Sequence, residues 1–445
     1  MKVHLAGYNY DLEFGENIRT PETLSAAYAR ISRSEKSVER LREEACRGVQ
    51  KARKSNEKII FGLGHASVAE HAVFNFDIID ISRYLTEMLQ HHRLASFTEK
   101  SQRYVKFNKN FYIPSQIRGT KLENEFESFC RECFEQYSSI IDRCHSAEIE
   151  KDKINEDARY VLPLSTYTQM GMTVNGRTLE YMIAVLNSRD MPEARDLGHA
   201  LYSKVSKLAP SIIKYTEGRE HLRHRIDSQG NGTFDIELLD YTPNANRDVA
   251  AMHLFESGIE YSRAVEKARS REVRQSVFKD IFSHMEMWDR PPRVFEHSKF
   301  TFGLSLSASA YAQLKRHRMS SQTVQAYNFS EKPVIPGTLT AAGADSIIHE
   351  MHEKSVLMAE KLGNVSQSIM PYAALNSTGR NVIITMNARE IYHFSRLRSD
   401  RHAQWEIRDI SDRICSMVKE IYPDMFMLLG GKDSFSSIRG NPSEL

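Results

Sequence analysis

The chain has 445 residues, of which 41% are hydrophobic and 27% are charged, a balance typical of globular proteins large enough for more than one core. Its formal net charge of +2 favours neither a nucleic-acid-binding protein nor a membrane-surface protein. No apolar run approaches the roughly 18 residues of a spanning helix, and Met1–Tyr10 lacks the apolar core of a signal peptide. We therefore expect a cytoplasmic protein that binds neither nucleic acid nor membrane.

The first half of the chain predicts helices and strands in an order that is not a regular βαβ alternation. A helical stretch over 21–60 precedes a strand near 73–78, where Val73, Phe74, Phe76 and Ile78 give the apolar pattern of a strand. A helix over 81–91, a strand over 101–107, a helical hairpin over 121–160, a strand over 166–174 and two more helices follow. This order predicts an α+β fold, with a small, mainly antiparallel sheet and several helices.

A polar, glycine-rich stretch at Asp227–Thr233 marks the expected domain boundary. After it the pattern restarts with a strand over 234–240 and a helical stretch over 246–286. We therefore expect two domains, 1–229 and 230–445. Later in the chain, Asn387 with Glu390 predicts a helix start, which puts Arg389 in a first turn whose backbone donors favour an anionic ligand.

Five cysteines occur in the chain, an odd and sparse set that indicates reduced thiols: Cys46, Cys130, Cys133, Cys144 and Cys415. Cys130 and Cys133 form a CxxC pair, but neither a second pair nor a nearby histidine cluster completes a zinc site. We therefore expect no bound metal.

Three short motifs recur in the same order in both halves of the sequence. Glu70-His71 with Phe74 and Phe76 resembles Glu296-His297 with Phe300 and Phe302; His91-His92-Arg93 resembles Arg316-His317-Arg318; and Thr173-Val-Asn175-Gly-Arg177 resembles Thr385-Met-Asn387-Ala-Arg389. The offsets between the pairs are 226, 225 and 212 residues. Three matches in register indicate a tandem duplication, and we call 1–229 the first copy and 230–445 the second copy.

The basic triplets carry the most specific chemistry. In the first copy, seven residues separate His91-His92-Arg93 from Ser101-Gln102-Arg103; the second copy has Arg316-His317-Arg318. Clustered arginine and histidine side chains suit a phosphate or a reduced flavin, because both are anionic. A third triplet, Arg223-His224-Arg225, lacks companion motifs and is interpreted as a solvated basic surface.

Together these motifs resemble the flavin-dependent thymidylate synthase (ThyX) family, whose signature is Arg-His-Arg, seven residues and then Ser. Gly64–His71 resembles the family's GHxSxxEH segment, Arg159–Pro163 resembles its RxVLP segment, and Asn387–Arg408 resembles its NAR…LR…HAQWEIR block. The resemblance implies reductive methylation of dUMP to dTMP, with FAD as cofactor and NADPH and methylenetetrahydrofolate as co-substrates. In this mechanism no cysteine attacks the pyrimidine, and the substrate is a small-molecule nucleotide.

The resemblance also implies roles for individual residues. Arg398 corresponds to the family's catalytic arginine, which activates the uracil. The expected dUMP-binding residues are Gln313, Arg316, Glu99, Ser101, Gln102, Arg103 and Arg159. The expected FAD-binding residues are His65, Ser67, His92, Arg93, Glu99, Arg316, His317, Arg318, Asn387, Arg389 and His393.

Each copy lacks part of this set, and the losses are nearly complementary. The first copy has His91 where the triplet should begin with arginine, Leu186 at the position of the activating arginine, and a degraded HAQWEIR block at 190–195. The second copy replaces GHxS with Pro291-Pro292-Arg293, has Val324-Gln325-Ala326 in place of ExSxR, and has no arginine before its Ile369-Met-Pro371 segment.

Family members resemble one another in being homotetramers whose sites are shared between subunits. The fused pair is therefore expected to form a homodimer that acts as a pseudo-tetramer, with composite sites that use both copies. Two sites would work where the family has four.

Two other functions are compatible with these motifs. One is flavin-dependent C5 alkylation of another uridine nucleotide, which the replacements His91 and Arg293 motivate. The other is a non-catalytic ThyX-like protein that binds flavin or nucleotide. Complementary loss favours an enzyme, because neutral decay would not spare one complete composite set.

Overall fold

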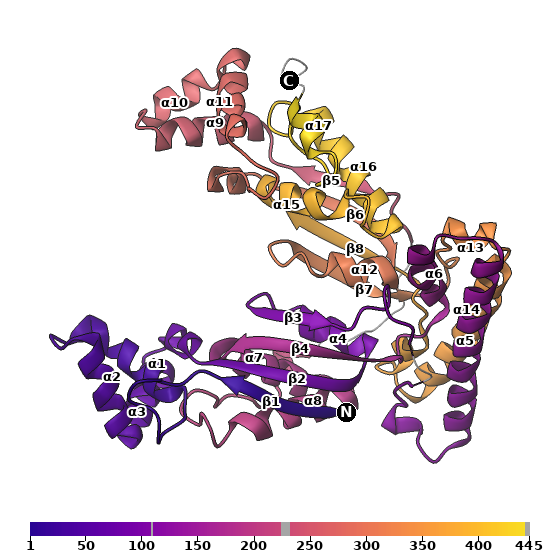
Figure 1. Cartoon of the computed structure of the whole chain (residues 1–445), viewed down its shortest axis with the longest axis horizontal. Coiled ribbons are helices and arrows are strands. Elements are labelled where there is room, and N and C mark those ends of the chain that lie inside the picture. The colour runs from indigo at the N-terminus through magenta and orange to yellow at the C-terminus, as the bar shows by residue number, and fades with distance from the viewer. Residues whose placement is uncertain (108–109, 224–231, 441–445) are drawn as a thin grey trace. The chain divides into compact units, whose positions relative to one another are not determined.

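The computed structural model describes residues 1–107, 110–223 and 232–440, which form two compact units (Figure 1). Unit 1 comprises Met1–Asp227 together with Ile335–Asn376, and unit 2 comprises Ser228–Val334 together with Ser377–Leu445. By packing, a segment of the second copy thus belongs with the first copy. The expected boundary at 229/230 stays a prediction, and the predicted seam falls mostly outside the described residues, as do His224 and Arg225 of the third basic triplet.

Unit 1 is built on a four-stranded antiparallel sheet. Its order is β1 (Lys2–Tyr8), β2 (Val73–Ser82), β4 (Tyr167–Asn175) and β3 (Ala95–Glu99). Phe74, Phe76 and Ile78 on β2 are fully or almost fully buried, because alternate side chains of a strand point to the same face. The helices of unit 1 that come from the first copy are α1 (Glu22–Arg30), α2 (Val38–Arg47), α3 (Val49–Asn56), α4 (Arg83–Gln90), α5 (Lys121–Ser146), α6 (Lys151–Ala158), α7 (Gly176–Asn187) and α8 (Pro192–Val205).

Two helices of the second copy complete unit 1, namely α13 (Gly337–Ala341) and α14 (Asp345–Val365). Helix α14 lies alongside α5 (Figure 1). Lys354 on α14 contacts Glu132 on α5 with a nitrogen–oxygen distance of 2.6 Å. Lys361 contacts Glu125 at the same distance. The packing and the ion pairs tie this part of the second copy to the first.

Unit 2 repeats the sheet of unit 1. Its strands have the order β5 (Glu237–Tyr241), β6 (Phe300–Ser307), β8 (Gly379–Met386) and β7 (Ser321–Asn328), all antiparallel. Its helices are α9 (Ala245–Glu256), α10 (Tyr261–Lys267), α11 (Arg271–Ser283), α12 (Ala308–Leu314), α15 (Ala388–Arg398), α16 (Trp405–Ile421) and α17 (Phe435–Gly440). The equal strand orders confirm two tandem α+β domains.

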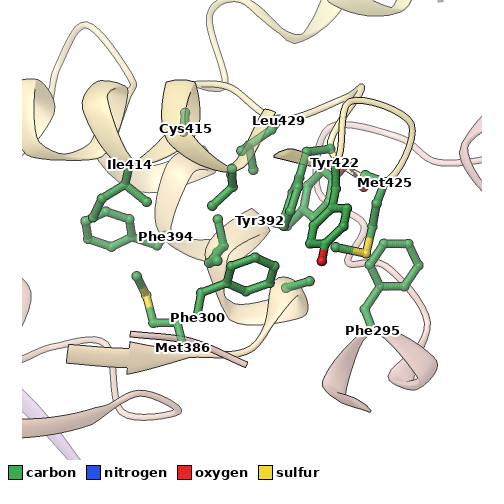
Figure 2. Close-up of a cluster of buried hydrophobic side chains, with 14 of the residues drawn as sticks. Phe295, Phe300, Met386, Tyr392, Phe394, Ile414, Cys415, Tyr422, Met425 and Leu429 are labelled. Carbon is green, nitrogen blue, oxygen red and sulfur yellow. Dashed lines mark hydrogen bonds between the residues drawn. The ribbon is translucent and has the colours of Figure 1, made fainter. Parts of the chain in front are cut away.

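The core of unit 2 lies between its sheet and the C-terminal helices (Figure 2). Phe300 and Met386 from the sheet meet Phe394 on α15 and Ile414 on α16, and all four side chains are completely buried. The dense aromatic packing holds α15 against the sheet, which fixes the position of Arg398 at the end of that helix.

Both copies use the same buried carboxylate to join the second strand of the sheet to the helix that follows. Ser82 caps α4, and Glu193 accepts hydrogen bonds from the Ser82 backbone N–H at 2.7 Å and from its hydroxyl at 2.6 Å. Ser307 caps α12 and donates from the same two groups to Glu406. This repeated contact aligns α4 of the first copy with α12 of the second without ambiguity. Arg83 and Ala308 then occupy equivalent positions.

One predicted strand of unit 1 is wrong, and two of its observed strands were not predicted. The strand expected over 101–107 is absent, because β3 ends at Glu99 and 102–104 form a turn in which the Ser101 hydroxyl accepts from the Arg103 N–H at 3.2 Å. Strand β1 at the N-terminus and strand β3 were not expected. Within the described ranges, no helix is both long and apolar enough to cross a bilayer.

Candidate active site

Arg398 in unit 2 is fixed by three hydrogen bonds at the C-terminal end of α15. Its Nη1 donates to Gln313 Oε1 at 2.9 Å, and its Nη2 donates to the Gln313 carbonyl oxygen at 3.2 Å. Its Nε donates to His317 Nε2, also at 2.9 Å. The side chain is only partly buried, so the guanidinium is oriented and still reachable. Three of the residues that the sequence assigned to the nucleotide and the flavin therefore meet in one group.

His317 is held in one tautomer. Burial and the neighbouring Arg398 charge lower the pKa of His317 well below its ordinary value of 6.5, so the ring is neutral. Because Nε2 accepts from Arg398, the ring proton is on Nδ1, which faces Glu390 Oε1 at 3.3 Å. His393 packs edge-on against the ring with centroids 5.7 Å apart, and burial lowers its pKa to about 4. The group thus carries its positive charge on Arg398.

The first copy keeps the buried histidine of this group but lacks the arginine and the glutamine. His92 is buried with its pKa lowered to about 4 by burial, and it packs edge-on against Tyr181 with centroids 5.8 Å apart, as His317 packs against His393. In the register of α4 with α12, Met88 stands at the position of Gln313. Leu186, at the position of Arg398, is almost completely buried. The first copy therefore has no arginine at the position of Arg398, although the charge of Arg189, three residues after Leu186, acts on His92.

Residues of the first copy that are predicted to bind the nucleotide gather at the end of β3. Glu99 is buried and forms an ion pair with Arg83 through Oε1, while its Oε2 accepts from Gln90 Nε2 at 2.9 Å. The turn that follows presents Ser101 and Arg103, and Arg103 pairs with Glu156 on α6. In the second copy β7 runs on to Asn328, so no comparable turn leaves the sheet there.

Arg159 begins the 3-10 turn Arg159–Val161 after α6 and is only 3% exposed. Its Nε donates to the Glu156 carbonyl oxygen at 2.9 Å, whereas its Nη2 has no hydrogen-bond partner among the described residues. Asn376, from the second copy, donates to the Arg159 carbonyl oxygen at 2.9 Å and to Gln102 Oε1 at 3.2 Å. Arg159 and Gln102 are therefore held in place by a residue far away in the sequence.

This part of unit 1 has buried charges and unfilled donors. Burial, and to a smaller degree the charges of Arg83 and Arg103, lower the pKa of Arg159. Burial raises the pKa of Asp157 to about 6, although the Thr338 hydroxyl donates to it. A buried N–H without an acceptor is costly, so unpartnered atoms such as Arg159 Nη2 and Gln102 Nε2 fit an anionic ligand.

Several residues assigned to FAD lie on accessible surfaces of their own units. Gly64 has φ +77°, a left-handed conformation that favours glycine, and it leads into the segment with His65 and Ser67, whose side chains are exposed. Exposed Arg93 follows α4, and exposed Arg316 and Arg318 follow α12. These residues are in reach of a ligand, and their assignment to FAD stays a prediction.

Asn387 and Arg389 both make contacts that stabilise α15. Asn387 caps the helix by accepting from the Glu390 N–H at 2.8 Å. Arg389 donates from Nε to the Pro291 carbonyl oxygen at 2.8 Å and pairs with Glu296 at 3.0 Å. The first copy has the same ion pair, Arg177 with Glu70 at 2.7 Å. The pair therefore supports the fold in both copies, and an FAD role for Arg389 stays a prediction.

The sequence motifs did not identify the residues whose hydrogen bonds and ion pairs hold the predicted site residues in place. These are Arg83, Gln90, Glu156, Asn376 and Glu390. Arg83 had a signal, since aligning the two copies gives Ala308 at the same position, and Glu390 was named by the sequence for the helix start alone. Among the described residues, no cluster of three or more histidine, cysteine, aspartate or glutamate side chains forms a metal site.

Comparison with known proteins gives two kinds of relative. UPF0159 protein Ta1429 of Thermoplasma acidophilum is 23% identical over 83% of this chain and 86% of its own length. A protein of Clostridium tetani named flavin-dependent thymidylate synthase is 32% identical over 46% of this chain and 84% of its own length. A crystal structure of the UMP/dUMP methylase PolB from Streptomyces cacaoi matches 48% of this chain and 93% of the PolB chain. The sequence identity is 19% and the TM-score is 0.37.

The family comparison matches the chain twice. Residues 16–211 and residues 237–424 each match the family described as thymidylate synthase complementing protein. The two matches fall on the two copies identified from the internal repeat, and the relative from Thermoplasma acidophilum spans both. The chain therefore belongs to the ThyX family of thymidylate synthase complementing proteins, as a tandem pair of its domains.

Proposed function

We propose that the chain is an FAD-dependent thymidylate synthase that converts dUMP to dTMP with methylenetetrahydrofolate and NADPH. Family membership supports a flavin-dependent methylation of dUMP, because relatives of about half this length are named flavin-dependent thymidylate synthase. The observation that carries the proposal is the division of the chemical groups between the copies. Unit 1 retains a buried group of donors suited to a phosphate, and unit 2 retains an oriented arginine suited to a uracil ring.

The phosphate of dUMP is assigned to unit 1. Arginine binds phosphate through paired, charge-assisted N–H donors. Arg159 is buried with an unpartnered Nη2, and Gln102 is buried with an unpartnered Nε2. The Ser101 hydroxyl and Arg103 are on the adjoining turn. A phosphate that accepts from these groups would remove the cost of burying them without an acceptor.

The uracil ring is assigned to Arg398. When C5 of the ring becomes nucleophilic, negative charge increases on the ring oxygens, and a fixed cation beside them stabilises that charge. The hydrogen bonds to Gln313 and His317 fix the guanidinium before the substrate binds. Neutral His317 accepts a hydrogen bond from Arg398 and adds no competing positive charge.

FAD is assigned to the basic and polar residues around these groups. The exposed Arg316 and Arg318, together with His393, are a donor set that fits an anionic flavin nucleotide. When bound, the flavin would supply the one-carbon transfer and the hydride, and the protein would supply binding, orientation and charge. In the first copy, His65 and Ser67 would add polar contacts.

We further propose that each working site uses the phosphate side of the first copy and the activating side of the second. The opposite combination would contain Met88, Leu186, Val324 and Ala326, which provide neither the activating cation nor the phosphate donors. A homodimer of the fused chain would then contain two working sites.

A complementation experiment tests substrate and activity together. The chain is expressed in a host that lacks thymidylate synthase, and growth without thymidine is expected. If the host does not grow although the protein is soluble and shows flavin absorbance, C5 alkylation of another uridine nucleotide is favoured. This is the hypothesis that His91 and Arg293 motivate. A colourless protein that takes up no added FAD would contradict both functions.

A further inference from the structure

Arg83 distinguishes the phosphate side of the first copy from the second copy. It is the first residue of α4, directly after the Ser82 cap, and the corresponding position of α12 is Ala308. The guanidinium is not a surface group, since Arg83 is only 6% exposed. A buried arginine therefore stands in the copy that keeps the phosphate donors, at a position where the other copy has a methyl group.

The position of α4 brings Arg83 to the other arginines of this group. The backbone N–H of Arg83 donates to the Thr166 carbonyl oxygen at 3.0 Å, so the helix begins against the segment that follows the Arg159–Val161 turn. The charges of Arg83 and Arg103 both act on Arg159. The guanidinium groups of buried Arg83 and Arg159 and of half-buried Arg103 are therefore near enough for their charges to interact.

The ion pair with Glu99 uses only part of the Arg83 guanidinium. Nη1 contacts Glu99 Oε1, while Nε is buried and lacks a hydrogen-bond partner among the described residues. Arg159 Nη2 and Gln102 Nε2 are in the same condition. A site built for structure alone would satisfy such donors. Three unfilled buried N–H groups point instead to a missing acceptor with several oxygen atoms.

We propose that Arg83 binds the 5′-phosphate of the nucleotide, as a third arginine beside Arg103 and Arg159. This inference rests on the proposed function and extends it, because it assigns a binding residue that the family motifs do not contain. Glu99 holds the Arg83 side chain in place from one side, and the Nε edge donates to the phosphate. The site therefore discriminates by the charge of the phosphate more strongly than Arg159 alone would allow.

The test compares ligands with and without the phosphate. Calorimetry with the full chain measures the Kd of dUMP and of deoxyuridine for wild type, Arg83→Ala and Arg83→Lys. One charge-assisted hydrogen bond lost with Arg83→Ala raises the Kd of dUMP about 10- to 100-fold, and the Kd of deoxyuridine stays within about twofold. Arg83→Lys keeps the charge without the Nε edge and gives an intermediate loss. The matched control is Arg53→Ala, which breaks an ion pair with buried Glu22 elsewhere in unit 1.

Two outcomes would overturn the inference. One is an equal loss for both ligands, which would make Arg83 a structural residue. The other is recovery of dUMP affinity by Arg83→Ala at alkaline pH, which would mean that Arg83 acts only by keeping Glu99 ionised. If Arg83→Ala does not fold, Arg83→Met takes its place, and the Kd of dUMP should still rise more than the Kd of deoxyuridine.

Failure of the proposed function gives a different result. Wild type would then bind no dUMP, and Arg83 would be judged with inorganic phosphate as the probe. Weaker phosphate binding by Arg83→Ala than by Arg53→Ala would support the anion-binding role, and equal binding would refute it.

Discussion

Arg398→Ala tests most directly the proposal that the second copy supplies the activating side of each site and the first copy the phosphate side. The change removes the donors to Gln313 Oε1, to the Gln313 carbonyl oxygen and to His317 Nε2, and with them the cation assigned to the uracil ring. Loss of one preorganised donor to a developing negative charge commonly lowers kcat by roughly 10²–10³, which corresponds to about 3–4 kcal/mol. We expect dTMP formation to fall by at least this factor, with little change in the KM of dUMP.

The stability of the variant should change much less than its activity. Arg398 is only partly buried, so water can replace it as a donor to Gln313. We therefore expect a loss in the free energy of unfolding of about 1–2 kcal/mol, the value of one or two ordinary hydrogen bonds. Turnover and denaturant unfolding, measured on the same preparation, separate the two effects.

The control is the corresponding position of the first copy. Leu186 is almost completely buried, so Leu186→Ala would open a cavity that costs about 2–5 kcal/mol. Leu186→Met keeps the volume and is the better control. Near wild-type turnover is expected. Comparable loss of kcat in Arg398→Ala and Leu186→Met would refute the composite assignment.

Three further predictions concern stability, nucleotide affinity and thiol chemistry. Burial raises the pKa of Glu193 to about 6 from 4.5, so its stabilising contribution is complete below about pH 4.5 and is lost as the pH rises through 6. The unfolding free energy of wild type minus that of Glu193→Gln should therefore rise by about 2 kcal/mol between about pH 7 and pH 4, and a constant difference would contradict this. Asn376→Ala removes the bonds to Gln102 and to the Arg159 carbonyl, so the KM of dUMP should rise about 3- to 10-fold in steady-state assays with kcat nearly unchanged; a loss confined to kcat would contradict a phosphate-side role. All five cysteines are buried with raised pKa values, so native protein should resist iodoacetamide without loss of activity and should titrate five thiols with Ellman's reagent after unfolding; rapid inactivation would show a reactive thiol.

The sequence was sufficient for the architecture because the duplicated motifs lie at structurally fixed points. Asn175 and Asn387 cap equivalent helices, and both sheets have the same strand order. The strand expected over 101–107 failed for a local reason. Ser101 accepts from a backbone N–H two residues later, and such a turn ends a strand whatever the hydrophobicity of the residues beyond it.

The site was less predictable because the contacts of its supporting residues come from tertiary packing, which no motif describes. Arg398 was identified by its spacing from Asn387, but the hydrogen bond from His317 to Glu390 depends on tertiary packing. Glu193 was interpreted as part of a degraded block, although it keeps the same contact with Ser82 that Glu406 keeps with Ser307. The first copy therefore retains the glutamate that makes this structural contact, although the rest of the block is degraded.

The segment Ile335–Asn376 ties the second copy to the first. It belongs to the second copy in sequence but packs in unit 1, where Asn376 fixes Gln102 and Arg159, and Tyr372 donates to Glu193 at 2.7 Å. In a homo-oligomer of identical copies, a change such as Leu for the activating arginine would appear in every site at once. In the fused chain each copy can change alone. Arg83 on one side and Arg398 on the other are therefore consistent with two copies that specialised after duplication.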